Sequence, residues 1–87
     1  MLCLYEIPVV AICPVDQSTD VYEAVFESAA PIMVEKIRAA VQEWRSRAEI
    51  QEAITQALAD AVGCKVTTIG SHSTVKTTII ATPQEAA

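Results

Sequence analysis

The chain has 87 residues, of which 52% are hydrophobic and 20% are charged, and its net charge is −5 at pH 7. This length allows one domain, residues 1–87, and the apolar content exceeds what one small core requires, so we expect apolar contacts between copies of the chain. The acidic balance argues against non-specific binding to a nucleic-acid backbone, which requires a basic surface, although four of the six basic residues fall between Lys36 and Arg47 and could form a local patch.

Cysteine usage and hydropathy indicate the compartment. The cysteines are odd in number and form no C-x-x-C motif, which favours free thiols in a reducing cytoplasm; they are Cys3, Cys13 and Cys64. Glu6 and Pro8 interrupt the apolar start of the chain, and no apolar run is long enough to span a bilayer. We therefore expect a cytoplasmic protein with neither a signal peptide nor a membrane segment.

The first third of the sequence predicts two strands joined by a polar turn. Residues 5–13 are rich in β-branched side chains, and Pro8 within them favours an edge strand. Pro14 ends this strand, and the polar residues 16–20 form the turn. Residues 21–28 alternate in polarity, which predicts a second strand whose buried face consists of Tyr22, Ala24, Phe26 and Ser28.

The middle of the sequence predicts two helices. Pro31 suits the first turn of a helix, whose apolar stripe consists of Val34, Ile37, Val41 and Trp44. Residues 45–47 interrupt the pattern. A second helix is expected from about Glu49 to Val62, because Gly63 is a natural helix stop. Its apolar stripe has i, i+3, i+4 spacing and consists of Ile50, Ala53, Ile54, Ala57, Leu58, Ala61 and Val62.

The last third predicts two strands and a tail. Residues 65–69 and 74–82 are β-branched runs separated by a turn at 70–73, and residues 83–87 are expected to fray. The resulting order ββααββ predicts an α+β fold, in which a four-stranded antiparallel sheet carries two helices on one face. Because four strands cannot close on themselves, we expect sheets of several copies to join edge to edge into a barrel, with active sites at subunit boundaries.

Cys13 and Asp20 are the first candidate site. Cys13 lies between a strand and a turn, next to Pro14, and Asp20 lies across the short turn, where its carboxyl group could approach the sulfur. A thiol beside a proton-carrying carboxyl group is the minimum for nucleophilic addition to an unsaturated carbon. Alternatively, Cys13 is an inert buried thiol and Asp20 caps backbone N–H groups of the turn.

Gln51, Glu52 and His72 are further candidates. Gln51 and Glu52 open the second helix, where a carboxylate suits the helix dipole, although Glu52 lies off the apolar stripe and could simply be exposed. His72 is the only histidine and lies in the predicted glycine-serine turn, where a histidine is more often solvated. Its spacing from the cysteines matches no ordinary structural-zinc pattern, so we expect no metal.

Two segments resemble known families. The sequence C-P-V-D-Q-S-T-D at residues 13–20 resembles the C-P-x-x-x-x-x-D segment of the QueF nitrile reductases and of the shorter QueF-like amidinotransferases of archaeosine formation. The sequence I-Q-E-A-I-T-Q-A-L-A-D at residues 50–60 is similar to the Q-E-x-[LI]-T-x-Q-[IL]-A-[DN] helix of GTP cyclohydrolases and the wider tunnelling-fold (T-fold) superfamily. The likeness covers residues 5–82 in order and implies a T-fold, with a homo-oligomer built from pentameric rings.

The resemblance also implies a reaction. In the QueF family a cysteine adds to the nitrile carbon of 7-cyano-7-deazaguanine and gives a covalent thioimide, an aspartate passes protons, and a helix carboxylate holds the guanine-like edge. By position these roles fall on Cys13, Asp20 and Glu52, and we add Gln51 and His72 as substrate-binding residues.

The fate of the thioimide divides the family. Reductases use NADPH, which they bind through a segment resembling E-S-K-S-L-K, whereas here Glu27 and Ser28 are followed by A-A-P-I. QueF-like amidinotransferases lack that segment and use ammonia to give an amidine, so we expect this reaction without a cofactor.

The substrate would be a free deazapurine or a modified nucleobase in tRNA. An NADPH-dependent reductase and a non-catalytic T-fold module that binds a purine or pterin stay open; cyclohydrolases are disfavoured because their C-x-x-H-type zinc ligands are absent.

Overall fold

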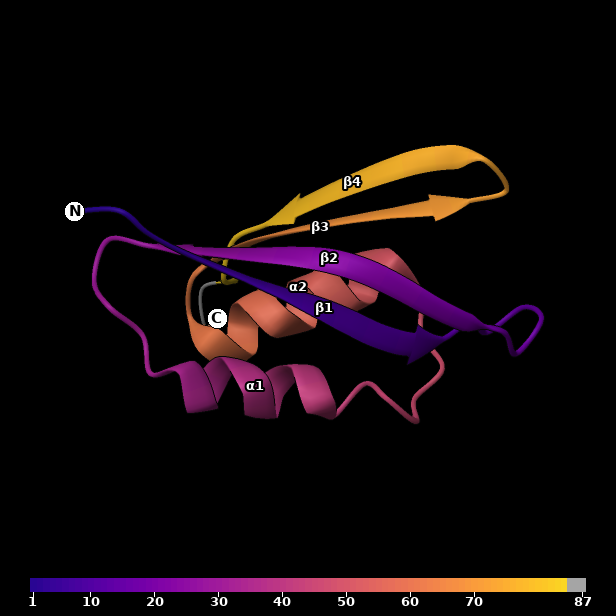
Figure 1. Ribbon diagram of the computed structural model, residues 1–87, viewed down its shortest axis with the longest axis horizontal. Helices are drawn as coiled ribbons and strands as arrows, with labels where there is room; N and C mark the ends of the chain where they lie inside the picture. Colours follow the sequence, from indigo (N-terminus) through magenta and orange to yellow (C-terminus); the bar gives the residue numbers. More distant parts are fainter. Residues whose placement is uncertain (85–87) are drawn as a thin grey trace.

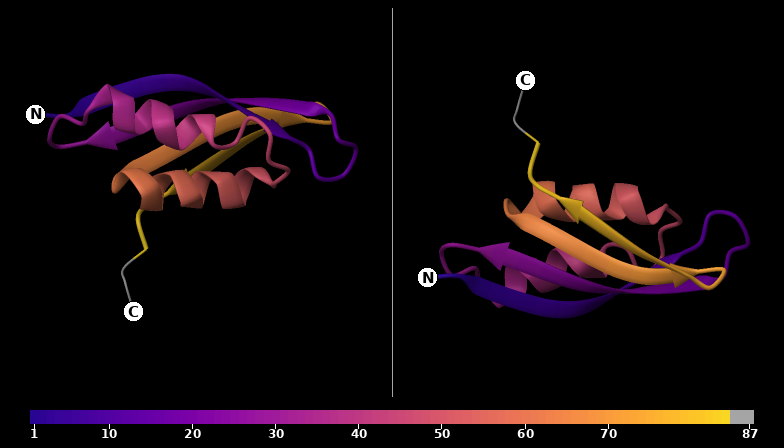
Figure 2. Two further views of the ribbon diagram at one scale, coloured as in Figure 1. Left: turned by 90° about the horizontal axis from the view of Figure 1, so that it is seen from below. Right: turned by 90° about the horizontal axis from the view of Figure 1, so that it is seen from above.

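The computed structural model describes residues 1–84 and contains one sheet and two helices (Figure 1). Its elements are β1 (Cys3–Ile12), β2 (Thr19–Ser28), α1 (Val34–Gln42), α2 (Gln51–Val62), β3 (Lys65–His72) and β4 (Val75–Ala81). The strands are antiparallel in the order β1-β2-β3-β4, and both helices cover the same face of the sheet (Figure 2). The predicted α+β architecture ββααββ is therefore confirmed, and β1, which contains Pro8, is an edge strand as expected.

The core lies between the sheet and the helices. On β2 the predicted alternation is confirmed: Tyr22, Ala24 and Phe26 are at most 1% exposed, whereas Val21 is 56% exposed. The antiparallel register puts Tyr22 opposite Val9 of β1, so their side chains share the helix-covered face. Within residues 1–84 the opposite face carries no helix, and it keeps partly exposed apolar side chains.

Helix α1 begins later than predicted. It starts at Val34, and Pro31 lies in the preceding connection rather than in the first turn. The hydroxyl group of Tyr5 accepts a hydrogen bond from the Ile32 N–H (2.9 Å), which ties this connection to the sheet before the helix starts. Of the predicted stripe, Ile37, Val41 and Trp44 are buried, whereas Val34 is half exposed.

Helix α2 ends where predicted, but its buried face is rotated from the predicted stripe. The Gly63 N–H donates to the Ala59 carbonyl (2.8 Å) with φ of 81°, a left-handed conformation that glycine adopts freely. The helix starts at Gln51, two residues after the predicted start, and Ile50 is half exposed. The buried residues follow the spacing i, i+3, i+4 from Gln51 and are Gln51, Ile54, Thr55, Leu58, Ala59 and Val62.

The predicted turn between β3 and β4 is confirmed, but its predicted bounds, residues 70–73, are wrong. Strand β3 continues to His72, and the turn to β4 consists of Ser73 and Thr74, whose φ angles of 48° and 71° give the two positive values that a tight hairpin needs. Gly70 is an internal residue of β3. Glycine is required there because the ring of Tyr22 packs on it: a Cβ atom would collide with Cδ1 of Tyr22 and lie 2.9 Å from Cε1.

The chain after β4 lies along α2. The Gln56 side chain donates to the Thr82 carbonyl (2.8 Å), and the Gln84 N–H donates to the Asp60 carboxylate (2.9 Å). The remaining residues of the predicted tail, 85–87, lie outside the described residues. In the part of the chain that the structure describes, no helix is long and apolar enough to cross a membrane.

Candidate active site

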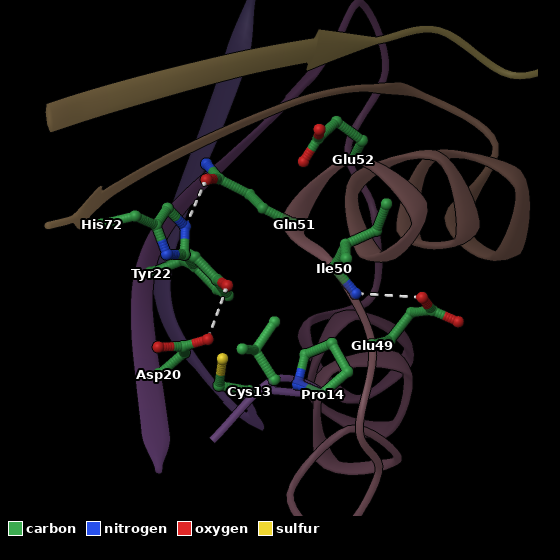
Figure 3. Close-up of a pocket in the computed structure, with 10 residues that line it drawn as sticks. Cys13, Pro14, Asp20, Tyr22, Glu49, Ile50, Gln51, Glu52 and His72 are labelled. Carbon is green, nitrogen blue, oxygen red and sulfur yellow. Dashed lines mark hydrogen bonds between the residues drawn. The ribbon is translucent and has the colours of Figure 1, made fainter. Parts of the chain in front are cut away.

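The hairpin between β1 and β2 brings Cys13 and Asp20 together. Ala11 pairs with Asp20, and the Cys13 N–H donates to the Ser18 carbonyl (2.8 Å), which continues the pairing past the end of β1. Cys13 and Asp20 are therefore diagonal neighbours on one face of the hairpin, a position from which side chains make contact. Figure 3 shows both side chains pointing into the same cavity.

The turn that carries Cys13 is closed by its own hydrogen bonds. The Gln17 N–H donates to the Cys13 carbonyl (2.9 Å), and the Asp16 carboxylate accepts from both the N–H (3.0 Å) and the hydroxyl group (2.6 Å) of Ser18. The hydroxyl bond, followed by the N–H bond, lowers the pKa of Asp16 from its usual value. The ionised form therefore favours the folded turn, and this contribution is present at neutral pH and lost as the pH falls through the lowered pKa.

The segment before α2 forms the facing wall. The Ile12 N–H donates to the Arg47 carbonyl (3.1 Å), and the Glu49 N–H donates to the Ile12 carbonyl (3.3 Å). This short parallel bridge fixes the start of α2 against the end of β1. The Glu49 carboxylate accepts from the Ile50 N–H (2.9 Å) and points away from Cys13 (Figure 3).

A cavity of about 220 Å³ lies between these two walls. The five residues predicted from the sequence all line it, and they are Cys13, Asp20, Gln51, Glu52 and His72. The structure brings them together from the turn after β1 and from β2, α2 and β3, although their chemical roles stay predictions. His72 reaches the cavity from the end of β3, and not from a glycine-serine turn as predicted.

Tyr22 is a site residue that the sequence reasoning missed. Its hydroxyl group donates to Oδ2 of Asp20 (3.2 Å), and its ring lies 5.7 Å from the His72 ring, centroid to centroid. Burial, with a further contribution from the negative charge of Asp20, raises the pKa of Tyr22 far above its ordinary value, so its hydroxyl group stays protonated and acts as the donor. A signal existed, because residues two apart on a strand share a face and Tyr22 follows Asp20 by two.

Gln51 is occupied by contacts within the protein. Its amide nitrogen donates to the carbonyl (3.2 Å) and hydroxyl group (3.1 Å) of Thr68 and to the Thr77 carbonyl (3.1 Å). Its amide oxygen lies 3.1 Å from Nε2 of His72, and because a glutamine oxygen only accepts, Nε2 is the donor. Gln51 therefore fastens α2 to β3 and β4 and orients the His72 ring.

Glu52 provides the carboxylate on the far side of the cavity. It lies in the first turn of α2, where the N–H groups of the helix favour negative charge, and it is exposed to solvent. Figure 3 shows its side chain across the cavity from Cys13. The arrangement thus places a thiol group and a carboxylate on opposite walls.

The other cysteines lie outside the cavity. Cys3 starts β1, at the opposite end of the strand from Cys13, and Cys64 is buried after α2, where burial raises the pKa of its thiol group. Within residues 1–84, no three histidine, cysteine, aspartate or glutamate side chains are grouped so that they could hold a metal ion.

Comparison with known proteins establishes the fold. No protein-family model matches the chain, and no curated protein sequence matches it. The crystal structure of the archaeosine synthase QueF-like in its apo form matches with a TM-score of 0.82 and 21% sequence identity, over 99% of this chain and 96% of that chain. The chain therefore shares the fold of this QueF-like protein, as the two sequence segments predicted.

Proposed function

We propose that the protein is a QueF-like enzyme that joins Cys13 to the nitrile carbon of 7-cyano-7-deazaguanine as a thioimide and converts this with ammonia into an amidine. The observation that supports it is the placement of a thiol and a carboxyl group on diagonal positions of one hairpin, lining the same cavity as Glu52. The likeness to an archaeosine synthase supports a deazaguanine-type nucleobase as the substrate class.

In the first step the sulfur of Cys13 bonds to the nitrile carbon. A nitrile carbon is a soft electrophile, which suits a thiolate. Asp20 takes the thiol proton and passes it to the nitrile nitrogen, which becomes basic as the carbon–nitrogen triple bond becomes a double bond. No atom is lost, so the thioimide carries the whole mass of the nitrile.

In the second step ammonia displaces the enzyme. The nitrogen of ammonia adds to the thioimide carbon, the carbon–sulfur bond breaks, and Cys13 recovers its thiol while a proton leaves the incoming nitrogen. The product is an amidine, and no electrons are exchanged, so the reaction requires neither NADPH nor an oxidant.

Glu52 would recognise the base. A carboxylate can accept two hydrogen bonds from the ring N–H and amino group of a 2-amino-pyrimidinone edge, and leaving those donors unpaired inside a cavity costs about 1–3 kcal/mol. With the heterocycle held at this edge, its nitrile group would point across the cavity toward Cys13. His72 would contact the base from β3.

Intact-mass spectrometry after mixing the protein with 7-cyano-7-deazaguanine tests the first step. We expect a mass increase equal to that of the nitrile in the wild type and in Cys3→Ser, and none in Cys13→Ala. Cys3 is a suitable control because it is a second, partly exposed thiol at the other end of the same strand. An adduct that persists in Cys13→Ala would reject Cys13 as the nucleophile.

Adding the second reactant separates the possible reactions. We expect ammonium salts to release an amidine from the adduct and NADPH to leave the adduct unchanged, whereas release of an amine with NADPH would identify a reductase. A binding module would show no adduct in any variant and would lose affinity for the base in Glu52→Ala alone. Comparing the free base with the same nitrile in tRNA identifies the physiological substrate form.

A further inference from the structure

Tyr22 occupies an unusual position for a tyrosine in a core. It is 1% exposed, and its ring packs on Gly70 and lies 5.7 Å from the ring of His72, centroid to centroid. A phenylalanine could fill the same space, so the ring alone does not explain the hydroxyl group. The hydroxyl group, however, is the part of the side chain that reaches the wall of the cavity (Figure 3).

The Tyr22 hydroxyl group is bonded to the proton carrier of the proposed reaction. It donates to Oδ2 of Asp20 at 3.2 Å, and Asp20 is itself only partly buried, at the end of the sheet. An aspartate side chain has several staggered rotamers, which point its carboxyl group in different directions. A fixed donor on the next position of that face selects the rotamer that stays over Cys13.

We propose that Tyr22 is a positioning residue that holds the Asp20 carboxyl group beside the Cys13 thiol through its hydroxyl group. The role of this contact in catalysis rests on the proposed function, whereas the geometry of the contact does not. Gly70 contributes to the same arrangement. Because it has no side chain, the Tyr22 ring can pack against its backbone, and the hydroxyl group can reach Asp20.

The hydrogen bond from Tyr22 to Asp20 also keeps the same donor and acceptor throughout the reaction. Because burial raises the pKa of Tyr22, its hydroxyl group remains the donor, and Asp20 always accepts. The carboxyl group can then exchange a proton with Cys13 and with the substrate while its orientation is held. Tyr22 itself needs to touch neither the substrate nor the reacting atoms.

The test compares Tyr22→Phe with the wild type in single-turnover formation of the thioimide. We expect the maximal rate to fall about 10-fold or more, as for loss of a hydrogen bond to a charged group, with the half-saturating nitrile concentration unchanged. In an Asp20→Asn background, Tyr22→Phe should have no further effect, because the two residues act as one unit. Additive losses, or a loss of nitrile affinity instead of rate, would overturn the proposal.

The second tyrosine provides the matched control. The Tyr5 hydroxyl group also makes one hydrogen bond, to the Ile32 N–H, but far from the cavity, so Tyr5→Phe should leave the rate of thioimide formation unchanged. A crystal structure of Tyr22→Phe separates this inference from the proposed function. We expect the ring to stay in place and the Asp20 carboxyl group to turn away from Cys13, whether or not a nitrile reacts; an unmoved carboxyl group would overturn the inference even in an active enzyme.

Discussion

The two glycines of the chain are required for different physical reasons. Gly63 ends α2 with a φ of 81°, and apart from its own chain neighbours none of the described residues crowds the place where a Cβ atom would be, so only the backbone conformation demands glycine there. Gly70 has an ordinary strand conformation, but a side chain there would collide with the ring of Tyr22. The first glycine serves the fold alone, whereas the second also serves the site.

Substitution of each glycine by alanine should separate these reasons. We expect Gly63→Ala to lower the free energy of unfolding by about 1 kcal/mol, from backbone strain, and to leave the rate of thioimide formation unchanged. Gly70→Ala should lower it by about 1–3 kcal/mol, from overpacking, and should also slow the reaction because the Tyr22 ring must move. Urea unfolding and adduct kinetics measure the two quantities; equal kinetics in both variants would contradict the role of Gly70.

For single residues, the sequence predicted the structure correctly where one physical rule applied and incorrectly where two such rules competed. The spacing of Cys13 and Asp20 across a short turn was sufficient to predict their approach, because hairpin register fixes which residues are diagonal neighbours. Gly70 was interpreted as a turn residue, since glycine in a polar stretch usually is one. The actual turn consists of Ser73, which was the last residue of the predicted turn, and Thr74, which carries no such signal although its φ angle is also positive.

At the scale of elements, α2 is attached to the sheet by polar as well as apolar contacts. Thr55 donates to the Gln51 carbonyl (2.8 Å), and its hydroxyl group lies 2.6 Å from that of Thr68 on β3, in the same buried network as the Gln51 amide. No buried side-chain nitrogen or oxygen within the described residues lacks a partner. This network determines how α2 is rotated, and hence where Glu52 lies relative to Cys13.

The same network explains why the buried face of α2 was predicted one position out of phase. A stripe drawn through apolar residues starts at Ile50, which is half exposed, whereas the true face includes the polar residues Gln51 and Thr55. Hydrophobic periodicity detects burial only through apolar side chains, so a face that begins with hydrogen-bonded polar residues is displaced. The existence and the end of the helix were predictable, and its rotation required the structure.

Loss of the Gln51 amide should therefore cost stability. We expect Gln51→Met to lower the free energy of unfolding by about 1–3 kcal/mol, because it leaves the buried acceptors of Thr68 on β3 and the half-buried carbonyl of Thr77 on β4 without their donor. Gln56→Met is the matched control on the same helix: its hydrogen bonds to Asp60 and Thr82 are exposed, so we expect a change within about 0.5 kcal/mol. Urea denaturation of both variants measures the difference, and equal losses would show that the buried network contributes nothing particular.

At the scale of the whole molecule, the sheet has two free edges and one open face. Within residues 1–84, β4 pairs only with β3, and β1 pairs only with β2 apart from the bridge at Ile12, so both outer strands present unpaired backbone groups. Because the four strands alternate in direction, the β4 edge of one copy can meet the β1 edge of the next in the same antiparallel sense. The open face adds apolar side chains that a closed barrel would cover, including Leu4, Val21 and Ile80, each at least 56% exposed. We therefore propose a ring of copies joined edge to edge.

The distribution of charged side chains favours contact between the β1 edge of one copy and the β4 edge of the next. Arg38 and Arg45 line a groove of about 240 Å³ together with residues of the β1 edge, including Ile7 and Val10. Along the β4 edge, α2 presents Asp60 near the end of the strand. A head-to-tail contact between these two edges would be a heterologous interface, and it would bring opposite charges together.

Reversing the basic charges of the groove should weaken the assembly. We expect the double variant Arg38→Glu/Arg45→Glu to shift the protein toward smaller species in size-exclusion chromatography with light scattering, because like charges would then face each other across the edge contact. The double variant Lys36→Glu/Arg47→Glu changes the net charge equally in the same region but leaves the groove intact, so it should retain the wild-type mass. Dissociation of both variants to the same extent would attribute the effect to overall charge, and a wild type that is a monomer would reject the ring itself.

Since Glu52 lies on the α2 side of the molecule and is open to solvent, a ring would also cover the cavity at the boundary between copies. Thioimide formation in the first variant should then fall together with its mass, which ties the assembly to the site.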